Sequence, residues 1–433
     1  MELALPTAEF ILMPFGSAGD HFPFIGLGHH LQDRGHTVRI AGNGYFAGQS
    51  RRSGLTFDEL YSKEEYLKNL NDPDIWHPTK GFAAVVGHPK MAEMVEDQHR
   101  YIIEQYVRNP KIIIVGGSLA FGARIARETH GLRLATVHLS PTVFLSALSP
   151  PRLPTMAIPR WWPRWMVKFL FWTANKTMIH PVMERSVGHY RRELRLPKIK
   201  NYFRDWIHSS EMVLGLWPDW FADKAADWPN NVKLTGFPFY DSHDAQPLKA
   251  DVQAFLNAGE RPVVITFGSA MKQGKALFHA AADACHALNL RAMLLTPFSE
   301  QVDELLPPTI KRFDYVPLSQ LLPYSAALVH HGGIGTTAQA LRAGSPQLIT
   351  PLAHDQFDNG HRAENLGVAR MLPASQANVK TITKALHTLL TDPAIRQNAI
   401  NLSRKLQDNS TFSRIADELE TFAVRSPSTK YWV

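Results

Sequence analysis

The chain has 433 residues, 45% of them hydrophobic, and its 46 Lys and Arg against 39 Asp and Glu give a net charge of +7. This length favours two or more domains, and the mild positive charge suits an anionic small ligand or membrane surface better than a nucleic acid. One cysteine excludes an internal disulfide framework. Without a signal-like start or an apolar run of about 18 residues, we expect a soluble cytoplasmic protein.

Short apolar runs alternate with helix-like segments along the chain, which predicts parallel sheets in a doubly wound α/β architecture. Helices are expected at Phe22–Arg34, Ala120–His130, Ala276–Asn289 and Thr336–Ala343, three of which end before a glycine. Strands are expected at Phe10–Pro14, Thr37–Ala41, Ile112–Val115, Leu134–Leu139, Met212–Leu216, Val263–Phe267, Arg291–Leu295, Ala327–His330 and Gln347–Thr350.

The alternation stops once, between Trp217 and Pro262, where Pro, Gly and Asn are frequent. We place a domain boundary there, near Asn230–Gln246. The tetrapeptide FGSA occurs on both sides of it, at Phe15–Ala18 and Phe267–Ala270, each time after the first strand of its half. The sequence therefore predicts two Rossmann-like domains, whose ligands lie at the carboxyl ends of the strands.

A glycine cluster in the second half, LVHHGGIGTTAQALRAG, runs from an apolar strand into a helix. Its glycines permit close approach of a ligand, and a helix start offers unpaired N–H donors at the positive end of a dipole. This pattern predicts a diphosphate site to which His331, Thr336 and Thr337 can donate hydrogen bonds. It lacks the lysine of a P-loop, and Ala338 replaces the third glycine of a dinucleotide fingerprint. The plainer alternative is a tight turn capped by threonine.

The stretch PLAHDQFDNGHR follows the strand expected at Gln347–Thr350. A carboxylate beside an amide, as in Asp355 and Gln356, suits the hydroxyl groups of a sugar. Asp358 and Asn359 can also be the polar cap of a helix. A metal site built from His354, Asp355, Asp358 and His361 is a rival interpretation, but the spacing fits no metal motif.

The segment YVPLSQLLPYSAALVHHGGIGTT, followed by HDQ, resembles the donor motif of the UDP-glycosyltransferases, family 1 of the glycosyltransferases. GSAGDHFPFIGL, GSLAFGARIA, HLSPTVFLSALSPP, TGFPFYD and AHDQFDN are similar to the branch containing rhamnosyltransferase B of rhamnolipid synthesis. The resemblance implies the GT-B fold, in which two Rossmann-like domains face each other across a cleft. It places an acceptor-binding domain at 1–235, a nucleotide-sugar-binding domain at 236–412 and a C-terminal segment, 413–433, packed back on the first domain.

The resemblance also implies roles for single residues. Tyr315 and Val316 would hold the nucleotide base, and Asp355 and Gln356 the sugar hydroxyls. Gln339 stands where many relatives have a ribose-binding Glu, and Ile334 where plant members have Trp, so a uridine or thymidine donor is left open. No metal and no cofactor beyond a UDP- or dTDP-sugar co-substrate is implied. The diphosphate would contact Ser269, His331, Gly333, Gly335, Thr336 and Thr337.

Many relatives use as general base a His three residues before a Pro, and the position three before Pro23 is Asp20. Vancomycin-type and sterol glycosyltransferases also have Asp there, so we expect Asp20 to be the base of an inverting displacement, with His21 as the second choice. An ordinary carboxyl with a pKa of about 4 would take the proton late in the reaction. Spacing alone favours Asp20 as a helix cap, and it is the resemblance that favours it as the base.

The segment Ile158–Lys176, IPRWWPRWMVKFLFWTANK, combines four Trp and two Phe with four basic residues. Such composition is typical of amphipathic helices at a membrane interface, although a wall of an acceptor pocket or a core-facing helix gives the same pattern. The candidate residues for acceptor or membrane contact are Trp161, Trp162, Trp165 and His138.

Together these features predict an inverting glycosyltransferase that moves a hexose or deoxyhexose, such as glucose or rhamnose, to a hydroxyl of a lipophilic acceptor, for example a hydroxy fatty acid ester. A polyketide, terpenoid or phenolic acceptor is the alternative within the family. A nicotinamide-dependent oxidoreductase is disfavoured because GSAGDH at 16–21 breaks the dinucleotide fingerprint. A non-catalytic nucleotide- or lipid-binding protein is a third option. The expected location is cytoplasmic, with peripheral contact at the inner membrane as an option, and no nucleic-acid partner.

Overall fold

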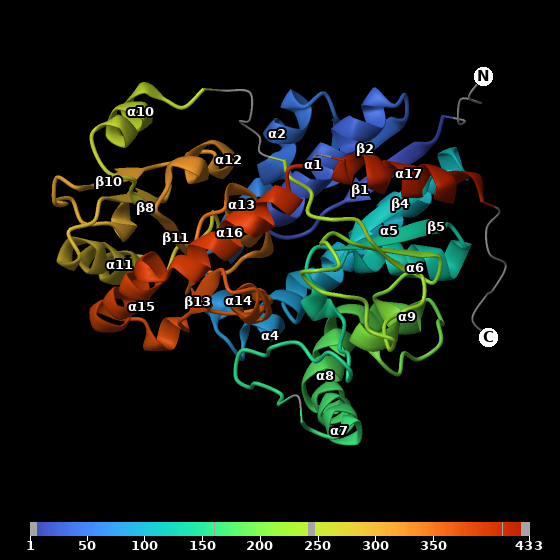
Figure 1. Cartoon of the computed structure of the whole chain (residues 1–433). Helices are drawn as coiled ribbons and strands as arrows, with labels where there is room; N and C mark the ends of the chain where they lie inside the picture. The colour runs from blue at the N-terminus through green and yellow to red at the C-terminus, as the bar shows by residue number, and fades with distance from the viewer. Residues whose placement is uncertain (1–6, 160, 241–246, 409, 426–433) are drawn as a thin grey trace.

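The computed structural model describes residues 7–159, 161–240, 247–408 and 410–425. Its two sheets are parallel throughout, as predicted, and helices flank both of them (Figure 1). The first sheet has the order β3-β2-β1-β4-β5-β6-β7. Its strands are β1 (Glu9–Met13), β2 (Thr37–Asn43), β3 (Thr56–Tyr61), β4 (Ile113–Gly117), β5 (Arg133–His138), β6 (Met212–Gly215) and β7 (Val232–Leu234).

The second sheet has the order β10-β9-β8-β11-β12-β13. In both sheets the first strand of the half is third in the order, so the two FGSA turns occupy equivalent positions, and Gly16 and Gly268 within them both have positive φ. The strands are β8 (Val263–Thr266), β9 (Ala292–Leu295), β10 (Ile310–Phe313), β11 (Ala327–His330), β12 (Gln347–Ile349) and β13 (Ala369–Met371).

The helices include the crossovers between these strands. In the N-terminal half they are α1 (Ala18–Asp33), α2 (Ala47–Arg52), α3 (Lys63–Asn69), α4 (Gly81–Val86), α5 (Pro89–Arg108), α6 (Phe121–His130), α7 (Arg164–Ala174), α8 (His180–Met183) and α9 (His189–Glu193). In the C-terminal half they are α10 (Ala250–Asn257), α11 (Lys275–Ala287), α12 (Leu318–Leu321), α13 (Ile334–Ala343), α14 (Gln356–Asn365), α15 (Val379–Thr391), α16 (Pro393–Lys405) and α17 (Thr411–Val424).

Central strands are buried on both faces, which explains their continuous apolar sequence. In β1, Phe10 and Leu12 belong to the core on one face of the sheet, whereas Ile11 and Met13 belong to the core on the other. Within the described part of the chain, no helix combines the length and apolarity needed to cross a membrane.

The last helix, α17, lies against α1 rather than in the domain that precedes it (Figure 1). Ile415 and Leu419 are fully buried in the core of the first domain. Glu420 accepts hydrogen bonds from Arg34 and His36, both at 2.9 Å. Residues 426–433 of the expected C-terminal segment, and 241–246 of the expected boundary, lie outside the described residues.

Candidate functional site

A cavity of about 470 Å³ lies between the two domains, lined by residues from the carboxyl ends of strands in both sheets. This is where ligands collect in open α/β sheets. On the side of the second sheet it brings together six residues that the sequence assigned to a nucleotide-sugar. They are Ser269, Tyr315, Val316, Gly335, Thr336 and Gln339.

The N-terminus of α13 forms part of this wall. Gly333 is the N-cap residue, and Gly335 lies in the first turn with its Cα toward open space. A Cβ added to Gly335 would meet no heavy atom of the described residues within 4 Å. The start of the helix is therefore open to the cavity, with the positive end of its dipole and its unpaired N–H groups available to an anion.

His331 packs between two glycines of neighbouring loops. A Cβ on Gly268 would lie 2.9 Å from its Cε1, and one on Gly333 would lie 2.5 Å from its Nε2. Burial lowers the pKa of His331 to about 4, so the ring is neutral at physiological pH. Its Nδ1 is buried and has no partner among the described residues. A neutral ring held in this way can donate one N–H to a ligand without carrying charge.

The adjacent histidine, His330, holds the glycine loop in place, a role that the sequence did not indicate. Its Nδ1 accepts a hydrogen bond from the Gly332 N–H at 3.2 Å, which leaves the Nε2 proton to bind Oε1 of Gln347 at 3.0 Å. Because both nitrogens are engaged inside the domain, His330 positions the loop and has no nitrogen left for a ligand.

Thr337 was expected on the diphosphate, but the structure gives its hydroxyl another partner. The side chain is buried and its Oγ1 donates to the Gly333 carbonyl at 3.0 Å. The Thr337 backbone N–H bonds to the same oxygen at 2.9 Å. Thr337 therefore stabilises the first turn of α13, while Thr336 beside it lines the cavity.

Asp355 and Gln356 precede and begin α14, and their side chains shape the loop after β12. Gln356 is buried, and its Oε1 accepts hydrogen bonds from the N–H groups of Leu352 at 2.8 Å and Ala353 at 3.1 Å. Asp355 is partly exposed and accepts a hydrogen bond from Asn359 at 2.8 Å. The structure thus leaves Asp355 with the more accessible side chain of the two.

The rest of this stretch joins the domains. Asp358 accepts hydrogen bonds from the Arg152 N–H at 2.8 Å and from Thr142 Oγ1 at 3.2 Å, both in the loop that follows β5. His354 has a positive φ of 56° and its Nε2 contacts the carbonyl of Ile75 at 2.8 Å. The expected helix cap at Asp358 is therefore an interdomain contact. In the described ranges no group of three or more His, Cys, Asp or Glu is arranged to hold a metal.

Asp20 is the third residue of α1, which begins four residues before the predicted start. Ser17 is the N-cap residue, and Asp20 at N3 completes a capping box with it, so Asp20 takes part in the cap without being the N-cap residue itself; Pro23 lies inside the helix rather than in its first turn. Oδ2 of Asp20 accepts hydrogen bonds from the Ser17 N–H at 2.7 Å and from Ser17 Oγ at 3.1 Å. Its neighbours Gly19 and Phe22 line the cavity, which places Asp20 at the cavity margin.

The pKa of Asp20 is raised to about 7, well above the ordinary value near 4 that the sequence suggested. Burial is the largest cause, and the negative charge of Asp355 across the cleft adds to it, whereas the hydrogen bonds from Ser17 lower the pKa. At neutral pH the carboxyl is therefore close to half ionised and is able to accept a proton.

His21, the second choice for the base, and His138, a candidate for acceptor contact, are both buried inside the first domain. His21 stacks on Phe46 with ring centroids 3.9 Å apart, its Nδ1 donates to the Ser17 carbonyl at 3.0 Å, and burial lowers its pKa to about 3. His138 contacts Ser118 Oγ at 2.8 Å and His208 Nδ1 at 2.9 Å through its two ring nitrogens. Neither histidine nor Asp20 itself is among the residues that line the cavity, but Asp20 is partly exposed, whereas both histidines are fully buried.

The N-domain wall of the cavity is mainly aromatic and aliphatic, and the sequence analysis missed most of it. Tyr45 and Phe46 directly follow the carboxyl end of β2. Because ligands bind at the carboxyl ends of strands in such sheets, these two residues could have been predicted from the sequence. Tyr66 lies in α3 and does not directly follow a strand that was expected from the sequence, so no sequence signal pointed to it. Burial, helped by the charge of Asp20, raises the pKa of Tyr66. The apolar and aromatic residues of this wall include Phe22, Tyr45, Phe46, Tyr66, Leu67, Leu70, Leu139 and Leu216.

The tryptophans of the basic aromatic segment lie outside this cavity. Trp161 and Trp165 are 79% and 69% exposed. Trp162 is partly buried against a small cluster that includes Ile158 and Val167, so it faces inward. Arg160 of the same segment is outside the described residues.

The N-terminal and C-terminal halves of the chain match two different family models. Residues 10–147 match the family model of the glycosyltransferase family 28 N-terminal domain. Residues 293–422 match the model of the erythromycin biosynthesis protein CIII-like C-terminal domain. The two models cover the first sheet up to the loop after β5 and most of the second sheet with α17.

Among curated proteins, the chain is 28% identical to O-mycaminosyltylonolide 6-deoxyallosyltransferase of Streptomyces fradiae, over 90% of this chain and 92% of that protein. It is 26% identical to the sterol 3-beta-glucosyltransferase of Candida albicans, over 94% of this chain but only 28% of that longer protein. The names of these two relatives concern macrolide and sterol compounds. The expected similarity to rhamnosyltransferase B in particular is not shown by them.

Solved structures agree with the fold. The glycotransferase of kitacinnamycin has a TM-score of 0.70 at 20% identity, covering 96% of this chain and 99% of its own. The spinosyn rhamnosyltransferase complexed with thymidine diphosphate has a TM-score of 0.65 at 18% identity, covering 94% of this chain and all of its own. The shared architecture is that of two parallel-sheet domains around a cleft.

Proposed function

We propose that the chain is a glycosyltransferase of the GT-B fold that transfers a hexose or deoxyhexose from a UDP- or dTDP-sugar to a hydroxyl of a lipophilic acceptor, with inversion. One observation carries the proposal. Asp20, whose pKa is raised to about 7, is flanked by Gly19 and Phe22, and these two residues line the same interdomain cavity as the open start of α13.

In the proposed donor complex the diphosphate lies at the start of α13. Ser269 and Thr336 offer hydroxyl donors, Gly335 leaves room at the helix start, and His331 offers a neutral N–H. Fixed donors of this kind stabilise the charge that develops on a leaving diphosphate. Tyr315 and Val316 border the same cavity and would hold the nucleotide base.

Gln339 also lines the cavity, and its Oε1 is buried without a partner among the described residues. We assign it to the ribose hydroxyls, because a buried amide oxygen without a donor is costly until a ligand supplies one. Asp355 would accept hydrogen bonds from the sugar, which agrees with its partial exposure at the cleft.

The proposed chemical step is a single displacement at the anomeric carbon. The acceptor oxygen forms a bond to this carbon as the bond to the diphosphate oxygen breaks, and the hydroxyl proton passes to Asp20. The diphosphate leaves with the bonding electrons, so charge and atoms balance without a metal ion. A base with a pKa of about 7 is better matched to this transfer than an ordinary carboxylate.

The acceptor is proposed to lie against the aromatic N-domain wall, where Phe22, Tyr45 and Phe46 favour an apolar compound. A hydroxy fatty acid ester and a polyketide aglycone both fit this description, and the macrolide relative supports the second. We also propose peripheral contact with a membrane on the cytoplasmic side, through the exposed Trp161 and Trp165.

Mass spectrometry of reactions that pair UDP-glucose or dTDP-rhamnose with hydroxy fatty acids, sterols and macrolide aglycones tests the proposal. The expected product has the mass of acceptor plus sugar minus water, and NMR of the purified product is expected to show an inverted anomeric configuration. Oxidation of NAD(P)H by the same preparation, or nucleotide binding with every donor sugar left intact, would overturn it.

A further inference from the structure

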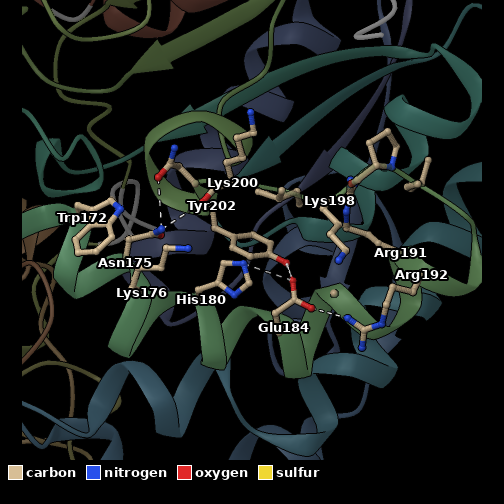
Figure 2. A pocket seen from close by; sticks show the side chains of 15 residues that line it. Trp172, Asn175, Lys176, His180, Glu184, Arg191, Arg192, Lys198, Lys200 and Tyr202 are labelled. Carbon is tan, nitrogen blue, oxygen red and sulfur yellow. Dashed lines mark hydrogen bonds and ion pairs between the residues drawn. The ribbon is translucent and has the colours of Figure 1, made fainter.

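The structure has a second cavity, of about 700 Å³ (Figure 2). None of its lining residues lines the interdomain cavity, and none has a role in the transfer reaction proposed above. It is formed by the end of α7, by α8 and α9, and by the segment that follows α9. Figure 2 shows Trp172, Asn175 and Lys176 on one side of the Tyr202 ring and Lys198, Arg191 and Arg192 on the other.

The backbone around this cavity is unusual. The three π-helical turns in the described part of the chain are Asn175–Ile179, Glu184–Gly188 and Tyr202–Trp206, and each contributes residues to the lining. π-Helical turns are rare, less favourable than regular helix and frequent at functional sites. Three of them around one cavity make it a candidate ligand site.

The lining is strongly basic. Lys176, Lys198 and Lys200 are exposed and have no acidic partner among the described residues. The one carboxylate of the lining, Glu184, is already engaged, because its Oε1 accepts a hydrogen bond from the Tyr202 hydroxyl at 2.7 Å and its Oε2 pairs with Arg192. The three lysines are therefore available to an anion.

The net positive charge of the whole chain is concentrated in the sequence around this cavity. Residues 160–205 contain eleven Lys and Arg against three Asp and Glu, a net charge of +8, whereas the full chain has +7. All other residues together are thus close to neutral. Such asymmetry within one chain indicates an anionic surface as partner.

An exposed aromatic face adjoins the cavity. Trp165, Phe169 and Trp172 are 69%, 63% and 55% exposed, and their spacing along α7 places them on one side of the helix. The opposite side is anchored by Val167, which is 2% exposed. Figure 1 shows α7 at the periphery of the molecule, away from both sheets. Trp172 belongs both to this face and to the cavity lining.

We propose that this cavity binds the phosphate-bearing headgroup of an anionic phospholipid in a bilayer, while the α7 face enters the interface beside it. Tryptophan favours the headgroup level, and basic residues gain from anionic lipid within a Debye length of the surface. A free phosphate would leave the aromatic face exposed to water, so the combination of the two features favours a bilayer. This inference rests on the peripheral membrane contact proposed above and does not depend on the transfer reaction.

Flotation with phosphatidylcholine vesicles, with and without phosphatidylglycerol, tests the inference on the full chain. Wild type is expected to bind the anionic vesicles about 10-fold or more tightly than the neutral ones. Lys176→Ala/Lys198→Ala is expected to lose about 10- to 30-fold in affinity for anionic vesicles and to bind neutral vesicles as wild type does. Trp165→Gln/Phe169→Gln is expected to weaken binding to both.

The matched control is Lys380→Ala/Lys384→Ala, which removes the same charge from the exposed side of α15. It is expected to bind as wild type does. Equal loss in both lysine pairs, or unchanged binding of the cavity variant, would overturn the headgroup site while leaving the membrane contact intact. Failure of wild type to bind any vesicle would overturn both. Glycosyl transfer to a water-soluble acceptor without vesicles is the separate readout of the proposed function.

Discussion

Asp20 and Asp355 come from different domains, and the charge of Asp355 helps burial to raise the pKa of Asp20 to about 7. Burial also raises the pKa of Asp355. A carboxyl whose charge is destabilised by burial and by a second carboxyl is a common arrangement at catalytic centres. Here the arrangement exists only while the domains are in contact, so the basicity of Asp20 depends on the interdomain contacts around α14.

The first prediction concerns pH. Asp20 accepts a proton only when ionised, so kcat/KM at saturating donor is expected to fall about tenfold per pH unit below 7 and to level off above it. His21 and His331 have pKa values of about 3 and about 4 and do not titrate in this range. A profile that is flat between about pH 5 and 8 would contradict the assignment.

The second prediction concerns turnover. Asp20→Asn keeps the shape and the hydrogen bonds from Ser17 but cannot take a proton, so kcat is expected to fall by about 10²–10⁴. The affinity for UDP or dTDP is expected to stay within about twofold, since the donor site lies on the other domain. Asp33→Asn, at the exposed end of the same helix, is the matched control and should retain wild-type kcat. A near-wild-type kcat for Asp20→Asn would rule Asp20 out.

The third prediction follows from the same pKa and concerns stability. The folded-state pKa of Asp20, about 7, exceeds the unfolded value of about 4, so the folded state binds this proton more tightly. The resulting stabilisation is fully present below about pH 4 and is lost as pH rises through 7. Asp20→Asn is therefore expected to raise Tm by about 2 °C or more at pH 8 and to leave it unchanged near pH 4. A lower Tm for the variant at pH 8 would contradict this.

The sequence predicted the inner strands better than the edges. The nine strands expected from apolar runs are all present, within one or two residues at their ends. The four that were not expected, β3, β7, β10 and β13, are the outer strands of the two sheets in the described part of the chain. An edge strand packs less completely, so it does not need a continuous apolar run. In β10, for example, Ile310 and Phe313 are buried while Lys311 is exposed.

The candidate site divides in the same way. Residues in a local motif, such as Gly335 and Thr336, could be placed from the sequence because the strand, turn and helix position them together. Thr337 could not be distinguished from Thr336, since only the course of the first turn decides which hydroxyl faces the cavity. The raised pKa of Asp20 was also inaccessible, because it depends on burial and on Asp355, which is 335 positions away in the chain.

The fourth prediction concerns metals. The proposed leaving-group contacts are N–H and hydroxyl donors around α13, so no divalent ion is needed to balance the diphosphate charge. Activity after dialysis against EDTA is expected to equal that of untreated protein. Loss of activity that Mg²⁺ or Mn²⁺ restores would contradict the proposal and would revive the metal interpretation of His354, Asp355, Asp358 and His361.

The fifth prediction concerns the open start of α13. Gly335→Val adds a side chain where the first Cβ meets no heavy atom of the described residues within 4 Å, so the fold should tolerate it. The same side chain projects into the cavity at the proposed diphosphate position. The Kd for UDP or dTDP, measured by calorimetry, is expected to rise about tenfold or more, because an anion can no longer approach the helix N–H groups. Tm should change by no more than about 2 °C.

Gly48→Val is the matched control for this test. Gly48 is an exposed residue of the short helix α2 and is not among the residues that line the cavity, so the substitution has a similar propensity cost and no contact with a donor. It is expected to leave nucleotide affinity unchanged. If Gly335→Val binds nucleotide as tightly as Gly48→Val does, the diphosphate cannot lie at the start of α13. In that case Ser269 and Thr336 would lose their proposed roles along with Gly335, because all three border the same part of the cavity.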